Sequence, residues 1–175
     1  MCIRDRPWAI PGTPGLQHRI GGLEKHEVTG NISYEASNHQ RQTELRHARV
    51  EKVGESFPAL EVDDPTGDAD LLVLGWGSTY GPIRGAVREA RDTGAKVARA
   101  HLRHLVPLPH DLGEVLDRYD RVLLPENNMG QLQMVLRARY LKDITGYHRV
   151  TGQPFRAAEL CEQILALLAD QEVPA

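Results

Sequence analysis

The chain has 175 residues, a formal net charge of −3 and 41% hydrophobic residues, which suits one globular domain or one domain with part of another. This balance gives no general attraction to nucleic acid or to an anionic membrane, and no apolar run approaches the roughly 20 residues that span a bilayer, so we expect a cytoplasmic protein. Cys2 and Cys161 are the only cysteines, too few to hold an iron–sulfur cluster alone.

The first part of the chain, residues 1–66, has the composition of loops. Residues 7–15 (PWAIPGTPG) form a Pro/Gly run, and Gly21-Gly22 and Gly30 follow it. Glycine reaches positive φ and proline lacks an amide donor, so both residue types interrupt regular structure. We interpret this part as an irregular segment from an incomplete domain.

Residues 36–53 are expected to form a single helix within that part. Ser37 or Asn38 would cap its start and Gly54 would end it. Its side chains are mostly polar, with only a thin apolar stripe, which favours a connector over a core element.

From residue 67 onward, short apolar runs alternate with amphipathic segments. Leu71 to Leu74 read as a strand buried on both faces. The expected strands cover 71–74, 96–100, 122–124 and 144–150. The expected helices cover 81–92, a short segment capped by Asp111 and reaching Tyr119, 130–141, and 155–169. This alternation predicts an α/β domain over 67–175, an open parallel sheet with helices on both faces.

Ligands of open parallel sheets usually bind beyond the carboxyl ends of the strands, so the turn after the first strand is a candidate site. There Gly77, Ser78 and Thr79 precede a helix whose free amides can hold an anion or face a partner, and Ser78 or Thr79 would cap that helix. The turn lacks the dinucleotide fingerprint because Tyr80 stands where its third glycine would be. A tight turn that needs small residues for packing is the alternative interpretation.

The turn after the second strand carries Arg103, which can pair with a carboxylate across a chain boundary. His101 and His104 flank it, but no third ligand follows at a spacing typical of a metal site. The alternative interpretation is a structured loop closed by two prolines. The charges between Arg84 and Arg99 are interpreted as solvated helix faces.

The turn after the third strand carries Glu126 and Asn127 at a helix start. These side chains cap the helix, bridge to another subunit or contact a polar ligand, and Glu126 is the best candidate for more than capping. We assign no residue as catalytic acid, base or nucleophile, and none as a metal ligand.

Six segments together resemble the alpha subunit of 2-oxoacid:ferredoxin oxidoreductases. Three of them are similar to the end of its thiamine-pyrimidine-type domain: PWAIPG at 7–12, GGLEK at 21–25 and GNISY at 30–34. Three are similar to its transketolase-C-terminal-like domain: LLVLGWGSTYG at 71–81, HLRHL at 101–105 and ENNMGQL at 126–132. The resemblance identifies the chain as the carboxy-terminal part of that subunit, with Met1 as an accidental start.

The resemblance implies thiamine-diphosphate-dependent oxidative decarboxylation of a 2-oxoacid, of the 2-oxoglutarate type, to acyl-coenzyme A with electrons passed to ferredoxin. It also implies that a beta subunit holds the thiamine diphosphate, the magnesium ion and an iron–sulfur cluster, that this chain alone binds no cofactor, and that the isolated chain is inactive. This chain would then serve docking between subunits or domains. Gly77, Ser78, Thr79, Arg103, Glu126 and Asn127 would face that boundary or reach coenzyme A.

Two alternatives stay open on the sequence alone. One is the carboxy-terminal domain of a transketolase or of a pyruvate dehydrogenase beta chain, which shares the same domain type. The other is a free-standing binding module of flavodoxin-like shape, with the turn at 75–79 holding a small anion.

Overall fold

A computed structural model of the chain describes residues 10–17 and 21–169. The chain divides into two compact units between Ala48 and Arg49. The domain boundary expected near residue 66 lies within the second unit, and which part folds independently stays a prediction.

The amino-terminal unit is held together by turns. Lys25 and Ile32 form an isolated antiparallel bridge around a turn in which the Gly30 amide donates to the His26 carbonyl over 2.9 Å. The helix α1 (Ala36–Gly54) then begins before the two residues expected to cap it. Asn38 lies inside its first turn, and its side chain donates to the Lys25 carbonyl over 3.2 Å. The capping prediction was wrong, because this side chain binds the preceding loop instead.

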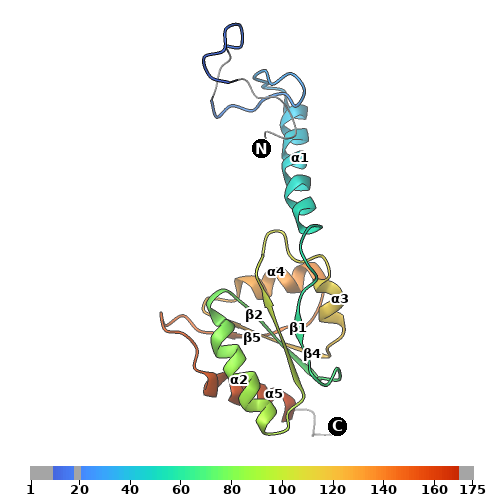
Figure 1. The fold of residues 1–175 in the computed structure, drawn as a ribbon, viewed down its shortest axis with the longest axis vertical. Coiled ribbons are helices and arrows are strands. Elements are labelled where there is room, and N and C mark those ends of the chain that lie inside the picture. The colour runs from blue at the N-terminus through green and yellow to red at the C-terminus, as the bar shows by residue number, and fades with distance from the viewer. Residues whose placement is uncertain (1–9, 18–20, 170–175) are drawn as a thin grey trace. The chain divides into compact units, whose positions relative to one another are not determined.

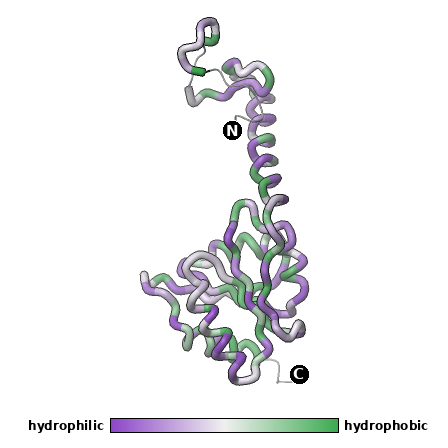
Figure 2. Tube along the Cα trace, in the orientation of Figure 1, coloured by the Kyte–Doolittle hydropathy of each residue, from purple (hydrophilic) through white to green (hydrophobic). Residues whose placement is uncertain are grey.

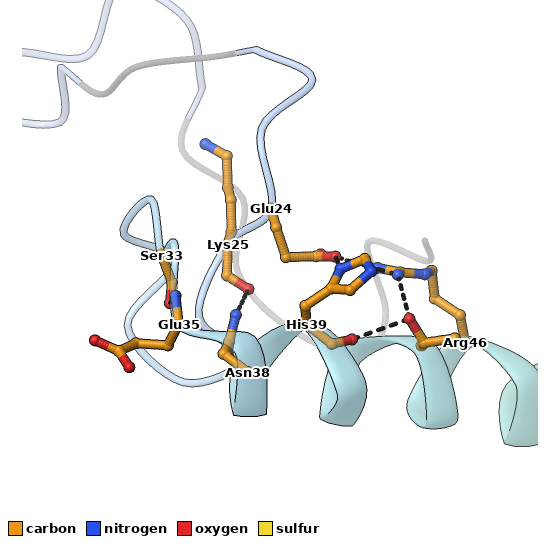
Figure 3. A network of polar contacts seen from close by, with 8 residues as sticks. Glu24, Lys25, Ser33, Glu35, Asn38, His39 and Arg46 are labelled. Carbon is orange, nitrogen blue, oxygen red and sulfur yellow. Dashed lines mark hydrogen bonds and ion pairs between the residues drawn. The ribbon is translucent and has the colours of Figure 1, made fainter.

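A charged network joins that loop to the surface of α1. Arg46 donates to both carboxylate oxygens of Glu24, over 2.9 and 3.2 Å, and His39 lies 2.9 Å from the same carboxylate (Figure 3). The Arg46 guanidinium, and after it His39, hold the pKa of Glu24 at about 2 instead of 4.5. The tube of α1 is mostly hydrophilic, as expected for a connector (Figure 2).

The second unit contains one five-stranded sheet. Its strands are β1 (Val62–Asp63), β2 (Leu71–Trp76), β3 (Val97–Leu102), β4 (Arg121–Glu126) and β5 (Thr145–His148), in the order β1-β3-β2-β4-β5. The last four pair in parallel, which confirms the predicted parallel sheet, whereas β1 pairs antiparallel with β3. The two residues of β1 are too few to show a strand pattern, so β1 could not be predicted from the sequence.

Helices cover both faces of the sheet. They are α2 (Tyr80–Asp92), α3 (Leu112–Asp117), α4 (Gln131–Tyr140) and α5 (Ala157–Ala169), with a 3-10 turn, η1 (Gly77–Thr79), before α2. Figure 1 shows α2 and α5 on one face and α3 and α4 on the other. Leu71 and Val73 pack with α2 and α5, while Leu72 and Leu74 pack with α3 and α4. All four side chains are fully buried, which explains the unbroken apolar run.

The start of α3 differs from the sequence prediction. Asp111 makes no side-chain cap with the helix, and its Oδ2 instead accepts a hydrogen bond from the Leu60 amide over 2.8 Å. Asp111 therefore ties the segment before β1 to the α3 side of the sheet. The helix ends at Asp117, and the buried Tyr119 that follows donates its hydroxyl to Asp64.

We expect residues 68–175 to fold alone and residues 1–66 not to, because the fully buried members of both apolar clusters all lie from Ala69 onward, with Leu60 and Val62 only partly buried against one of them. Limited proteolysis of the whole chain should leave a resistant carboxy-terminal fragment. Amino-terminal sequencing of the resistant fragments checks this. A protected amino-terminal third would show that the boundary is misplaced.

The Glu24 network predicts a specific acid response. Since the folded pKa of Glu24 is depressed, its contribution to stability is present above pH 4.5 and is lost as the pH falls toward about 2. Titration of the Glu24 carboxyl carbon by NMR should give a midpoint near 2. In Arg46→Gln the midpoint should rise toward 4.5, and by more than in His39→Gln, because Arg46 is the larger cause. A native midpoint near 4.5 would mean that the network does not form in solution.

Candidate functional site

The turn after β2 is closed by its own side chain. The Thr79 hydroxyl donates to the Trp76 carbonyl over 2.8 Å and accepts from the Trp76 amide over 3.1 Å. Thr79 is buried and does not cap α2, contrary to the expectation for this position. A Cβ on Gly75 would lie 2.5 Å from Ile83 Cδ1, so this glycine serves packing, while Gly77 and Ser78 are exposed. In this turn Gly75 and Thr79 are therefore buried and packed, whereas Gly77 and Ser78 are accessible to a partner.

A pocket of about 600 Å³ lies beside the turn after β3. Aromatic rings line it in two pairs: Phe57 stacks on His104 with centroids 4.1 Å apart, and Tyr80 meets His101 edge-on at 5.1 Å. Arg103 also lines the pocket, is exposed, and forms no ion pair within the part of the chain that the structure describes. That Arg103 pairs with a carboxylate across a chain boundary stays a prediction.

His101 is an uncharged ring in this pocket at neutral pH. Burial is the largest cause that lowers the pKa of His101 below its usual value, and the neighbouring Arg103 and Arg99 guanidinium groups lower it further. A hydrogen bond with the Gly77 backbone acts in the opposite direction and raises it. An uncharged imidazole offers one donor and one acceptor. The pocket can therefore hold a planar or polar group beside the Arg103 charge.

Glu126 has a structural role at the turn after β4. Its carboxylate accepts hydrogen bonds from the Leu132 amide (3.1 Å), the Gln133 amide (3.0 Å) and the Asn128 side chain (3.0 Å). The side chain has no exposed surface, so the structure gives Glu126 the capping role that the sequence left as one alternative. Asn127, next to it, is exposed.

His148, the last residue of β5, pairs with Glu126 in the sheet and was missed by the sequence analysis. Its Nε2 lies 3.9 Å from the Glu126 carboxylate. A Cβ on either Gly130 or Gly146 would come within 3 Å of its ring, so both glycines make room for this imidazole. Gly130 also has a φ of 86°, which favours glycine. These glycines at a turn and within a strand are the only signal that the sequence offered.

The candidate residues therefore form two groups along the carboxyl edge. Gly77, Ser78, Thr79 and Arg103 belong to the turns after β2 and β3, whereas Glu126 and Asn127 belong to the turn after β4. Within residues 10–17 and 21–169, no three His, Cys, Asp or Glu side chains gather in a way that could hold a metal ion. Cys161 is buried, and Cys2 lies outside the described residues. No described helix is long and apolar enough to cross a membrane.

Comparison with known proteins places this arrangement among oxidoreductase subunits. The family described as pyruvate:ferredoxin oxidoreductase core domain II matches residues 69–160, which run from just before β2 into α5. The subunit KorA of the 2-oxoglutarate oxidoreductase from Mycobacterium tuberculosis is 56% identical over 164 residues, covering 94% of this chain and 25% of that protein. The alpha subunit of 2-oxoacid:ferredoxin oxidoreductase 1 from Aeropyrum pernix is 30% identical, over 95% of this chain and 26% of its own length.

A solved structure shares the fold. It is the 2-oxoglutarate:ferredoxin oxidoreductase from Magnetococcus marinus, with 2-oxoglutarate, coenzyme A and succinyl-CoA bound. It is 31% identical with a TM-score of 0.80, over 91% of this chain and 28% of that chain. The present chain thus spans about a quarter of the length of the curated relatives that it matches.

The capping role of Glu126 predicts a stability effect. Glu126→Gln keeps the side-chain volume but turns an amide donor toward the helix amides, which should lower the free energy of unfolding by about 1–3 kcal/mol. Glu114→Gln, at an exposed position in the first turn of α3, is the matched control and should change it by less than about 0.5 kcal/mol. Urea unfolding of both variants measures the difference. Equal stability of the two variants would refute the capping role.

Proposed function

This chain belongs to the 2-oxoacid:ferredoxin oxidoreductase family, and from that membership we propose that it works as core domain II of the alpha subunit in an assembled enzyme. The observation that carries the proposal is that the family match at 69–160 coincides with the α/β domain, from β2 into α5. The 56% identity to KorA, over 94% of the chain, favours this family over a transketolase or a free-standing binding module.

We propose that the enzyme oxidises 2-oxoglutarate. Both the Mycobacterium tuberculosis relative and the Magnetococcus marinus enzyme are named for that substrate. The reaction removes carbon dioxide from the 2-oxoacid, transfers the acyl group to coenzyme A and passes two electrons to ferredoxin. Thiamine diphosphate, when bound, supplies the electron sink for the decarboxylation.

The chemical centre is assigned to the rest of the assembly. The described residues offer no ligand set for magnesium, and Cys161 is their one free cysteine and is buried. Neither the diphosphate–magnesium group nor an iron–sulfur cluster fits such a donor set. We therefore derive no catalytic step on this chain and assign both groups to a beta subunit.

The contribution of this chain is docking at the carboxyl edge of its sheet. Gly77, Ser78, Arg103 and Asn127 are exposed there and would face a subunit or domain boundary. Thr79 and Glu126, which the sequence analysis grouped with these residues, are buried; Thr79 holds the turn that carries Gly77 and Ser78, and Glu126 holds the turn that carries Asn127. Arg103, which forms no ion pair with any residue that the structure describes, would bind a carboxylate of the partner or a phosphate of coenzyme A.

The assembled enzyme provides the test. The 175-residue chain alone should not reduce a viologen dye with 2-oxoglutarate, coenzyme A and thiamine diphosphate, whereas the full alpha subunit co-expressed with its beta subunit should. In that assembly, Arg103→Ala should raise the KM for coenzyme A, or the beta-subunit concentration needed for half-maximal rate, by roughly tenfold.

Arg118→Ala, at an exposed position after α3, is the control and should change neither value. Dye reduction by the isolated chain would contradict the docking role. An Arg103→Ala enzyme that behaves as the control would remove Arg103 from the boundary and leave the family assignment intact.

A further inference from the structure

Three arginines lie along one flank of α2. Arg84, Arg88 and Arg91 are spaced four and three residues apart, so a helix of 3.6 residues per turn places them in one row. Glu89 projects from a different side of the helix. The buried face of α2 is made by Ile83, Ala86, Val87 and Ala90, which pack against the sheet and α5. The row is therefore a cationic flank of α2, with Glu89 on another side of the helix and Asp92 at its last residue.

An open groove of about 760 Å³ runs beside this row. Its lining includes the three arginines of α2 together with Arg99 of β3, and two carboxylates, Asp63 and Asp92. The groove therefore carries two positive charges in excess, within a chain whose formal net charge is −3. Because the chain as a whole is negative and this groove is positive, a negatively charged partner is attracted to the groove and not to the rest of the surface.

Two of these arginines are fixed in position. Arg91 donates to the Asp63 side chain over 3.2 Å and to the Asp63 carbonyl over 2.7 Å, and Arg99 donates to the same carboxylate over 2.7 Å. Arg91 also donates to the Val97 carbonyl over 3.0 Å. These contacts engage all three guanidinium nitrogens of Arg91, so Arg91 and Arg99 contribute charge held at a fixed position beside the groove.

The other two arginines are available. Arg84 and Arg88 are exposed and form no hydrogen bond or ion pair within residues 10–17 and 21–169. Like charges four residues apart on a helix are destabilising, so this pair has no benefit for α2 itself. The sequence analysis interpreted these charges as a solvated helix face. Acidic and basic side chains together would solvate such a face equally well, so solvation does not explain why Arg84 and Arg88 carry the same sign.

We propose that the groove formed by Arg84, Arg88, Arg91 and Arg99 docks an acidic polypeptide segment. Planar guanidinium groups bind carboxylates through paired hydrogen bonds. The row from Arg84 to Arg91 extends about 10 Å along the helix, which is the length of about three residues of an extended chain. The groove is open along the surface of α2 and β3, so an extended chain can lie in it. The inference rests on this charge distribution and not on the proposed enzymatic role.

A labelled acidic peptide tests the proposal. A fluorescein-tagged peptide of about ten glutamates is titrated with the full 175-residue chain, and its fluorescence anisotropy is followed at low and high salt. The peptide should bind at low salt and be released at high salt. Arg84→Glu combined with Arg88→Glu should weaken binding by roughly tenfold or more, because two attractions become repulsions.

Arg118→Glu combined with Arg137→Glu is the matched control. Both positions are exposed and belong to the elements on the opposite face of the sheet, after α3 and in α4. This pair carries the same charge change and should alter the affinity by less than about twofold. Thermal unfolding of both variants checks that each remains folded.

Three results would overturn the proposal. The first is no binding of the peptide at low salt. The second is an equal loss of affinity in the two double variants, which would mean general charge attraction. The third is displacement of the peptide by inorganic tripolyphosphate at lower concentration than by unlabelled peptide, which would make the groove a site for small phosphorylated anions.

Discussion

The burial of β2 on both of its faces is the constraint on which the rest of the domain depends. β2 is the middle strand of five, and its residues from Leu71 to Gly75 have almost no exposed surface. Alternate side chains enter two separate apolar clusters, one with α2 and α5 and one with α3 and α4. Because every side chain of this run is used for packing, chemistry at β2 is confined to the turn where the strand ends.

The turns after β2 and β4 pair their buried side chains in hydrogen bonds within the turn, and they leave the neighbouring residues Ser78 and Asn127 exposed. Thr79 closes the first turn with two hydrogen bonds to Trp76, and Glu126 accepts three at the start of α4. Fixed turns of this kind hold neighbouring exposed residues in a defined position at little further entropic cost. Ser78, beside Thr79, and Asn127, beside Glu126, are the exposed residues held in this way.

Sequence reasoning succeeded where a periodic pattern extended over many residues. The apolar run at Leu71 to Leu74 and the alternation after it identified the parallel sheet, because buried strands and amphipathic helices leave distinct periods. It failed where a single side chain had more than one available partner. Asp111 binds the Leu60 amide instead of capping α3, and the sequence cannot show that these residues meet. His148 was missed because Gly130 meets it only after folding, and Gly146, two residues before it in β5, gives no sign in the sequence that it makes room for the ring.

We propose that the carboxyl edge of this sheet faces a subunit or domain boundary in the assembled enzyme. Hydrogen–deuterium exchange, followed by mass spectrometry, compares the 175-residue chain alone with the same segment inside the alpha–beta assembly. The account predicts slower exchange in the assembly for the turns around Ser78, Arg103 and Asn127, and unchanged exchange at Gly94, which precedes β3 at the opposite edge. Equal exchange at the three turns, with new protection at Gly94, would contradict it.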